Sequence, residues 1–528
     1  MKLPFNWKFP YASRRMPVLA KNVVATSQPL AAQAGLQMLQ KGGNAVDAAL
    51  ATAIALTIVE PTSNGLGSDA FALIWDGKEL VGLNASGRSP AAWTPDYFSK
   101  YDSMPVLGWD ATTVPGAVSA WVKLWKKYGS LEFRDLFEPA IHYAREGFLV
   151  APIIAMGWRL LVRQYKKFPE WMNTFTLKGK GPKPGQKFKF PNHADTLELI
   201  AETEGQTFYR GVIAEKITDH AQNTGGLMTL EDLENHEADW VEPLSMEYQG
   251  VNLHEIPPNG QGITALIALG ILKNLDLSRY KVDSLEALHL QLEAMKLAFR
   301  DAHRYVSDPQ SWELDPRHLL DPAYLKQRAA LIDSKKAQDF KYGKPKIGDT
   351  VYLCAADSEG MMVSYIQSNF WAFGSGIVIP GTGIAMQNRG NGFTLEEGHP
   401  NQVGPEKRPY HTIIPAFVTK EGSPLMSFGV MGGHLQPQGH VQMMVRIFGY
   451  KQNPQAGLDA PRWQVTEGLG VKLEAGMNPK IIAQLSNIGH QVIKSHYIDF
   501  GGGQIIYKLE DGYLAASEPR KDGQAVGY

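Results

Sequence analysis

The chain has 528 residues, of which 44% are hydrophobic, 10% aromatic and 20% charged, as in globular proteins with a large core. This composition excludes disordered and fibrous classes. The 52 basic and 53 acidic residues give a net charge of −1, which supplies no global field for a polyanion, so we expect no nucleic-acid partner. The single cysteine, Cys354, rules out an internal disulfide and cysteine-rich metal motifs.

Two segments bear on where the protein is found. Residues 1–22 mix prolines, aromatic residues and bases, without the apolar stretch of about 7 to 15 residues that a secretory signal needs. The most apolar run, residues 48–59, is far shorter than the roughly 20 residues that cross a bilayer. The sequence therefore predicts a cytoplasmic protein with no membrane partner.

Helices are expected over most of residues 30–310. Asn44 can cap a buried helix that runs through Val59, and Asp283 with Glu286 resembles a capping box for a later helix. Apolar side chains recur on that later helix at three- and four-residue steps and charged ones form a second face, which predicts core packing with a solvated back. The two faces are Leu285, Leu288, Leu292, Met295 and Phe299, and Glu293, Lys296 and Arg300.

The last third of the chain has a different character. Residues 335–349 are rich in charges and contain glycines and a proline, which predicts an exposed loop. Strand formers follow at 350–357, then a turn at 358–360 and a returning strand at 361–367, and further strands are expected at 413–418, 425–430 and 505–509. The fold class is therefore α/β (α+β), with a helical N-terminal two-thirds and a sheet-rich C-terminal third.

The Asp349–Thr350 bond joins the predicted loop to the predicted strand. If this bond were cut, Thr350 would become an N-terminal residue whose hydroxyl is a nucleophile and whose own α-amine is a general base. The same hydroxyl can attack the carbonyl of Asp349 and form an ester that water opens, so self-cleavage and amide hydrolysis share one nucleophile. An Asp-Thr pair is also common in ordinary strands, so this hypothesis needs further motifs.

A glycine pair after a predicted strand supplies a second part of such a site. Met431-Gly432-Gly433-His434 can present two adjacent backbone N–H groups to an oxyanion without side-chain obstruction. A tight turn is the alternative interpretation.

Ordered blocks extend along almost the whole chain. They are LAAQAGLQMLQKGGNAVDAALATAIAL, EPTSNGLGSDAFALIW, TVPGAVSAW, AREGF, FYRGVIAEKI and GGLMTLEDL, then GDT at 348–350, FGSG at 373–376, VGPEKRP at 403–409, GVMGGH at 429–434 and DAPRW at 459–463. In these blocks the chain resembles the γ-glutamyltranspeptidase family (γ-glutamyltransferases, glutathione hydrolases) of N-terminal-nucleophile hydrolases.

The resemblance implies a precursor that cleaves itself before Thr350. The large region, residues 1–349, and the small region, residues 350–528, would remain heterodimer partners in one intertwined domain, a four-layer αββα sandwich, with a dimer of heterodimers as a further assembly. Thr350 would be the nucleophile, Ser368 would take the place of the family's second catalytic threonine, and Gly432 and Gly433 would be the oxyanion donors. The implied chemistry requires no cofactor and no metal.

The chain departs from the family where a γ-glutamyl group is held by its α-carboxylate and α-ammonium. The family's arginine is displaced by two positions, to Arg88. Phe370 stands at the asparagine position, with Asn369 one step earlier on the opposite strand face, and Gly392 stands at the acidic position. Loss of a buried carboxylate that pairs with an ammonium costs a few kcal/mol of binding.

The family's serine pair becomes His411-Thr412, and His434 beside the glycine pair is a further residue expected to face the substrate. A metal site built from His411, His434 and His440 is disfavoured because their spacings match no metal motif.

We therefore predict a self-processing amidohydrolase or acyltransferase that cleaves a small-molecule γ-glutamyl or related acyl amide through an acyl-enzyme on Thr350. One alternative is an amidohydrolase like the glutaryl and cephalosporin acylases, without γ-glutamyl specificity. The alternative of another class is an unprocessed, non-catalytic binding protein.

Overall fold

Two seven-stranded antiparallel sheets form the centre of the molecule in a computed structural model that describes residues 15–312, 314–341 and 348–528. In the first sheet the strand order is β19 (Gln524–Gly527), β2 (Val23–Thr26), β10 (Asp349–Ala356), β11 (Met362–Phe370), β3 (Asp69–Trp75), β4 (Leu80–Ala85) and β7 (Asp239–Val241). In the second it is β1 (Val18–Ala20), β18 (Gly512–Ser517), β17 (Gly502–Leu509), β13 (Ser423–Met431), β12 (Ala416–Lys420), β9 (Val251–Glu255) and β8 (Leu244–Tyr248).

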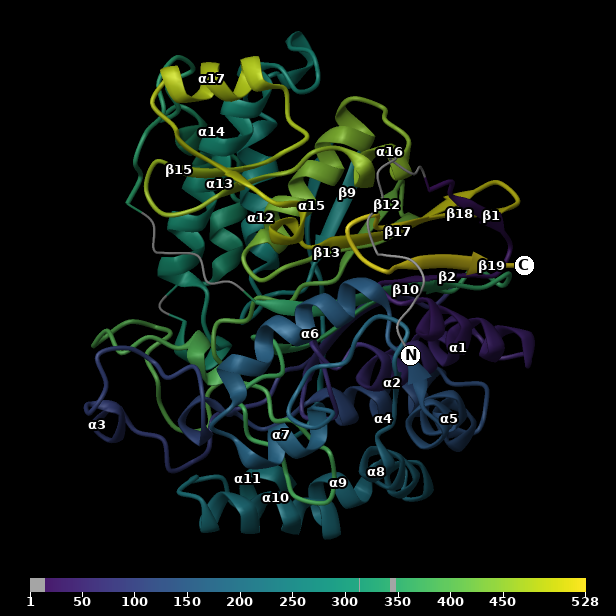
Figure 1. Cartoon of the computed structure of the whole chain (residues 1–528). Coiled ribbons are helices and arrows are strands. Elements are labelled where there is room, and N and C mark those ends of the chain that lie inside the picture. Colours follow the sequence, from purple (N-terminus) through teal and green to yellow (C-terminus); the bar gives the residue numbers. More distant parts are fainter. Residues whose placement is uncertain (1–14, 313, 342–347) are drawn as a thin grey trace.

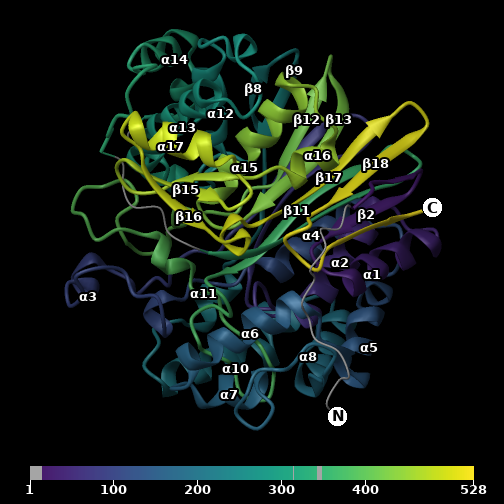
Figure 2. The ribbon, with the colours of Figure 1, turned by 45° about the horizontal axis from the view of Figure 1, so that its top comes forward.

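Helices cover the outer sides of the two sheets, as Figures 1 and 2 show from two directions. On one side lie α1 (Pro29–Gln40), α2 (Ala45–Val59), α4 (Ala117–Tyr128), α5 (Glu138–Glu146), α6 (Pro152–Tyr165), α7 (Pro169–Phe175), α8 (Pro191–Glu202), α9 (Gln206–Arg210), α10 (Val212–Asn223) and α11 (Leu230–Glu234). On the other lie α12 (Gly262–Leu272), α13 (Leu285–Tyr305), α14 (Pro322–Ala329), α15 (Leu435–Met444) and α17 (Pro479–Asn487).

The smaller elements lie at the periphery. They are α3 (Pro95–Phe98), α16 (Pro454–Asp459), a pair formed by β5 (Phe148–Leu149) and β6 (Lys187–Phe188), and a three-stranded sheet of β14 (Trp463–Val465), β15 (Gly470–Glu474) and β16 (Gln491–Ser495). None of the helices in the described ranges is both long and apolar enough to span a membrane.

Strand β10 shows how the sequence builds this core. Val351 and Leu353 belong to the apolar cluster between the first sheet and its helices, whereas Tyr352 and Cys354 belong to the cluster between the two sheets. Because side chains alternate across a strand, a strand buried on both faces must be apolar at every position. This is why residues 350–356 form a continuous, fully buried run.

The predicted β-hairpin is confirmed as β10 and β11, and the two strands lie side by side in the middle of the first sheet, between β2 and β3. The predicted strands near 413–418, 425–430 and 505–509 are confirmed as β12, β13 and β17. The predicted loop is without helix or strand over residues 335–341, and residues 342–347 of it lie outside the described residues.

The expectation of helices early and strands late is only partly right. β2, β3, β4 and β7 come from the first half of the chain and flank β10 and β11 in the same sheet. β2 and most of β3 are short, buried and apolar on both faces, so periodicity does not distinguish them from buried helix segments.

Two expectations for α13 are also wrong. Its N-cap is Ser284, whose hydroxyl accepts a hydrogen bond from the N–H of Ala287, and Asp283 instead pairs with Arg446. The predicted solvated face is in fact buried at Glu293 and Lys296, because the segment around residues 333–338 and His490 cover it. The predicted cap of α2 is confirmed: the Asn44 side chain accepts hydrogen bonds from two N–H groups of the first turn.

Candidate active site

Thr350 lies at the start of β10, buried, where the β10–β11 pairing is irregular. Asp349 is opposite Phe370 and Val351 is opposite Gln367, so β11 contains one extra residue at this point. Such a bulge redirects a side chain and is frequent beside active sites. Here it brings the hydroxyls of Thr350 and Ser368 to 3.3 Å from each other.

These two hydroxyls and the Asp349 carbonyl form a chain of hydrogen bonds. Thr350 Oγ donates to Ser368 Oγ, and Ser368 Oγ donates to the carbonyl oxygen of Asp349 at 2.6 Å. Gln436, on the first turn of α15, donates to Thr350 Oγ at 3.4 Å. The hydroxyl of Thr350, the predicted nucleophile, is thus oriented by two neighbours, and the Asp349 carbonyl is polarised by the Ser368 hydroxyl.

The glycine pair forms the turn between β13 and α15. Gly432 has φ 128° and Gly433 has φ 59°, a region that residues with a Cβ rarely adopt. Within the described part of the chain neither N–H donates a hydrogen bond, while Gln261 Nε2 fixes the carbonyl of Gly433 at 3.0 Å. Gly432 and Thr350 line the same small cavity of about 160 Å³, so the structure brings the predicted nucleophile and a predicted oxyanion donor together.

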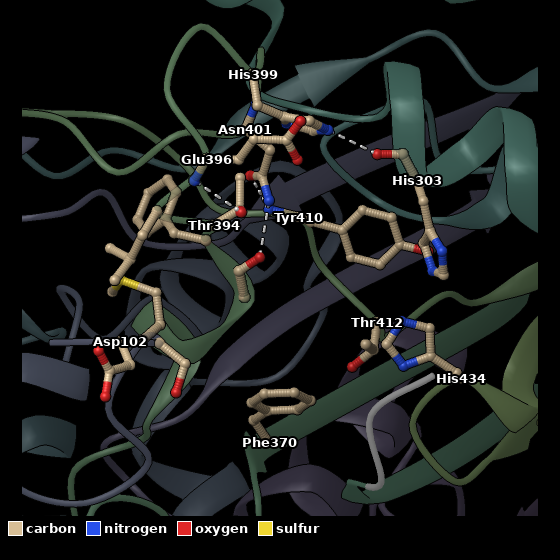
Figure 3. A pocket seen from close by; sticks show the side chains of 15 residues that line it. Asp102, His303, Phe370, Thr394, Glu396, His399, Asn401, Tyr410, Thr412 and His434 are labelled. Carbon is tan, nitrogen blue, oxygen red and sulfur yellow. Dashed lines mark hydrogen bonds between the residues drawn. The ribbon is translucent and has the colours of Figure 1, made fainter. Parts of the chain in front are cut away.

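A larger cavity, of about 580 Å³, has in its wall Phe370, the residue opposite Asp349 in the sheet (Figure 3). Three predicted substrate-facing residues, Phe370, Thr412 and His434, line it together with Gly392. The His434 ring stacks on Tyr410 with 5.5 Å between ring centroids and 14° between ring planes, which holds it in the wall.

The other three predicted substrate-facing residues do not line this cavity. Arg88 pairs with Asp308 at 3.0 Å and donates to the carbonyl of Glu406. Asn369 points to the opposite face of β11, where its side-chain oxygen accepts a hydrogen bond from Ser68 at 2.8 Å. His411 is fully buried.

His411 belongs to a buried polar group that also contains Asp69 and Arg389. His411 Nε2 lies 3.1 Å from Asp69 Oδ2, and the other oxygen of Asp69 accepts hydrogen bonds from the N–H groups of Gly87 and Gly116. Burial raises the pKa of Asp69 to about 7 against the opposing charge of Arg389, and burial with the same arginine holds the pKa of His411 well below its usual range. Burial lowers the pKa of Arg389 to about 9.

Sequence reasoning missed Arg389 and Gln436. Arg389 is the one base in the run QNRGNG, which reads as an ordinary turn. Gln436 follows the glycine pair by three residues, so its place on the first helical turn after the pair was the available signal.

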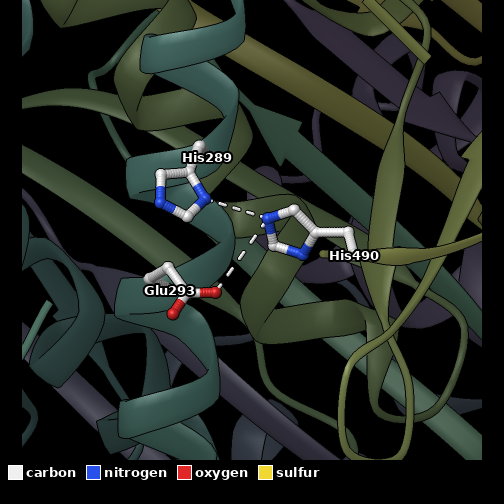
Figure 4. A group of neighbouring side chains, drawn as sticks. All are labelled: His289, Glu293 and His490. Atoms are coloured by element: carbon white, nitrogen blue, oxygen red, sulfur yellow. Dashed lines mark hydrogen bonds and ion pairs between the residues drawn. The ribbon is translucent and has the colours of Figure 1, made fainter. Parts of the chain in front are cut away.

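Among the described residues, one group has the composition of a metal site: His289 and Glu293 of α13 with His490, whose ligand atoms lie within 4.8 Å of one another (Figure 4). The carboxylate of Glu293 is already paired with a cation, because Lys296 Nζ lies 2.8 Å from Glu293 Oε1. His289 Nδ1 lies 2.9 Å from His490 Nε2, and His289 Nε2 lies 2.8 Å from the carbonyl oxygen of Asp333. A buried, hydrogen-bonded network of this kind is satisfied without an ion, and its residues are distinct from those around Thr350.

Comparison with known proteins gives the family. The model of the family described as Gamma-glutamyltranspeptidase matches residues 31–528. The chain is 37% identical to the glutathione hydrolase-like YwrD proenzyme of Bacillus subtilis, over 96% of this chain and 98% of that protein. It is 34% identical to the oxamate amidohydrolase proenzyme of Klebsiella pneumoniae, over 94% and 97% of the two chains.

A solved structure is similar throughout. The crystal structure of cephalosporin acylase from Bacillus halodurans superposes with a TM-score of 0.96 at 46% identity and covers 100% of this chain and 99% of that chain. The class of protein is therefore an amide-hydrolysing enzyme. The chain belongs to the γ-glutamyltranspeptidase family, which confirms the resemblance found in the sequence.

Proposed function

We propose that this protein is a self-processing amidohydrolase whose nucleophile is Thr350. The observation that carries the proposal is the hydrogen-bond chain from Thr350 Oγ through Ser368 Oγ to the Asp349 carbonyl oxygen. In the first step Thr350 Oγ attacks the carbonyl carbon of Asp349, the C–N bond breaks, and an ester forms as the Thr350 nitrogen takes up a proton. Water then hydrolyses the ester, which leaves a carboxylate on Asp349 and a free threonine amine.

The freed amine is the general base of the mature enzyme. It takes the hydroxyl proton of Thr350 as Oγ attacks the substrate amide, and it returns this proton to the departing amine. The N–H groups of Gly432 and Gly433 stabilise the tetrahedral oxyanion, and Ser368 orients Thr350. Water or an acceptor amine then releases the acyl group from Thr350.

We propose that the substrate is an acyl amide of γ-glutamyl type or with a related acyl group. The second candidate, an acylase without γ-glutamyl specificity, is favoured by the absence of an acid at Gly392. Two carboxylates do line the large cavity, Asp102 and Glu396, but both residues are exposed, where a pair with an ammonium contributes little. Relatives with different printed names, an oxamate amidohydrolase and a cephalosporin acylase, are consistent with a variable acyl pocket.

The cut would divide the chain into the large region, 1–349, and the small region, 350–528. The interleaving of β10 and β11 between β2 and β3 supports a heterodimer that stays together after cleavage, because separating the regions would open the first sheet. Three of the four apolar clusters among the described residues, one between the sheets and one beneath each helical cover, support the four-layer αββα order.

The test begins with the purified protein on a denaturing gel. We expect a small fragment of about 20 kDa (58.3 kDa × 179/528) whose N-terminal residue is Thr350. Thr350→Ala should remain a single band, and Thr350→Ser, which keeps a hydroxyl, should be cut. An uncut wild-type chain with Met1 as its only N-terminus would favour the binding-protein alternative.

Substrate class is tested next with the processed enzyme. Release of nitroaniline from γ-glutamyl and glutaryl 4-nitroanilides compares acyl groups with and without the α-ammonium. Turnover of the glutaryl compound that exceeds that of the γ-glutamyl compound supports the acylase candidate, and the reverse order supports γ-glutamyl specificity.

A further inference from the structure

Arg389 is a fully buried arginine whose hydrogen-bonding capacity is mostly unused. It opens a 3₁₀ helix, Arg389–Gly392, and its Nη1 donates to Thr412 Oγ1 at 2.7 Å. Its Nε and Nη2 have no hydrogen-bond partner among the described residues. A buried N–H without a partner is costly, so native proteins seldom retain two on one side chain unless something else satisfies them.

The unused atoms form one edge of the guanidinium. Nε–H and an Nη2–H are parallel donors, and this edge is the one that receives the two oxygens of a carboxylate in bidentate pairs. Among the described residues no carboxylate uses this edge, and this includes Asp69, whose charge acts on Arg389. The charge of Asp69 partly offsets the lowering of the Arg389 pKa by burial. The two oxygens of Asp69, however, are engaged by His411 and by two backbone N–H groups.

Arg389 lies directly behind the wall of the large cavity. The Phe370 ring lies over its guanidinium, with 4.4 Å from the guanidinium carbon to the ring centroid. Phe370 and Thr412 both line the cavity, as does Gly392 at the other end of the same 3₁₀ helix. Two cavity-lining side chains therefore contact the arginine, and one of them, Thr412, offers a hydroxyl beside it.

Phe370 itself is held in a strained position. Its φ of 75° is unusual for a bulky residue, and strain of this kind gathers at functional sites. In the continuous chain its ring packs against Gly348, where an added Cβ would come within 3.0 Å of Phe370 Cδ2. Gly348 precedes the Asp349–Thr350 bond by one residue, so the Phe370 ring packs directly beside the proposed cleavage site.

We propose that Arg389, which Phe370 covers in the uncut chain, binds a carboxylate on the acyl group of the substrate, with Thr412 beside it. This inference rests on the proposed function, since it concerns the acyl pocket next to Thr350. The substrate class is an amide whose acyl chain ends in or bears a carboxylate. The role that the sequence assigned to Arg88 passes to Arg389, because Arg88 is already paired with Asp308.

The test compares two anilides that differ only in the carboxylate, glutaryl 4-nitroanilide and pentanoyl 4-nitroanilide, on processed enzyme. We expect wild type to have the higher kcat/KM for the glutaryl compound. Arg389→Gln should reduce the glutaryl-to-pentanoyl ratio of kcat/KM by about 10- to 100-fold, as expected for loss of a charged hydrogen-bonded pair. Arg389→Lys keeps the positive charge but loses the pair of parallel N–H donors. It should therefore retain part of the wild-type preference for the glutaryl compound.

Arg88→Gln is the matched variant, since it removes the other arginine considered for this role. Its ratio should stay within about twofold of wild type, because Arg88 does not line the cavity. A ratio that is unchanged in processed Arg389→Gln, or that falls in Arg88→Gln instead, would overturn the assignment of Arg389.

A measurement on the wild-type enzyme covers the case in which Arg389→Gln fails to fold. Free glutarate should inhibit pentanoyl anilide hydrolysis competitively at a concentration at least tenfold below that of pentanoate, and equal inhibition by the two acids would refute the inference. Failure of the proposed function looks different, because the enzyme would then remain uncut or hydrolyse neither anilide.

Discussion

Replacement of Ser368 by alanine tests the processing chemistry most directly. Ser368 Oγ is 2.6 Å from the Asp349 carbonyl oxygen and 3.3 Å from Thr350 Oγ, so Ser368→Ala removes both the donor that polarises the scissile carbonyl and the acceptor that orients the nucleophile. Loss of a single oxyanion donor costs about 3–4 kcal/mol of transition-state stabilisation. We therefore expect self-cleavage to slow by roughly 100- to 1,000-fold.

The assay follows precursor made by cell-free translation with labelled methionine, and measures the half-time for appearance of the small fragment. Ser364→Ala is the matched control, because Ser364 is a buried serine on the same strand whose hydroxyl contacts Tyr352 rather than the scissile bond. It should be cut with the half-time of wild type. Cleavage of Ser368→Ala at the wild-type rate would show that Ser368 does not act on the Asp349 carbonyl.

Three further predictions concern buried charges and the glycine turn. Lys296→Met leaves Glu293 buried without its cation and should lower the free energy of unfolding by about 3–5 kcal/mol, measured by urea denaturation. Burial raises the pKa of Glu60 to about 7, so between pH 5 and pH 7 this carboxyl is ionised in the unfolded chain but still largely protonated in the folded chain. Wild type should then lose a few kcal/mol of stability relative to Glu60→Gln, measured by urea denaturation at pH 5 and pH 8. Gly432→Ala should reduce anilide kcat by at least about tenfold, because φ 128° is unfavourable for alanine and the turn presents an oxyanion donor.

Each of these has a control within the chain. Lys41→Met breaks an exposed ion pair with Glu138 and should change stability by less than about 1 kcal/mol. Gly422→Ala introduces alanine at φ 77° in open space, away from the site, and should leave turnover unchanged. A difference between wild type and Glu60→Gln that is the same at pH 5 and pH 8 would contradict the assignment for Glu60.

The hairpin around Thr350 was predicted most accurately from the sequence, because strand propensity and a tight turn are local properties. The early strands β3 and β4 were not predicted from the sequence, because a strand that is buried on both faces lacks the alternation of apolar and polar residues. The charged residues of α13 were misassigned for a related reason. Glu293 and Lys296 satisfy each other in the core, and helical periodicity cannot distinguish such a pair from two solvated charges.

The residues predicted to face the substrate also fall into two groups, those that line the large cavity and those that do not. Phe370, Thr412 and His434 line the large cavity, while Arg88, Asn369 and His411 do not. Spacing along the chain places a residue on a strand face, but which side chains meet across elements depends on packing. The proposed role of Arg389 depends on the tertiary structure alone, because only there does this arginine lie behind the cavity wall with two N–H donors unused.

By itself the amino-acid sequence determined the family, the threonine at the loop-to-strand junction and the glycine turn, because each of these is written in consecutive residues. Only the tertiary structure decided that a bulge opposite Thr350 joins two hydroxyls to the Asp349 carbonyl, and that Arg389 rather than Arg88 lies behind the wall of the large cavity. The physical reason is that hydrogen-bond partners and counter-ions are chosen by distance in space. In this fold Gln436 reaches Thr350 across 86 positions of the chain, and Ser368 reaches it across 18.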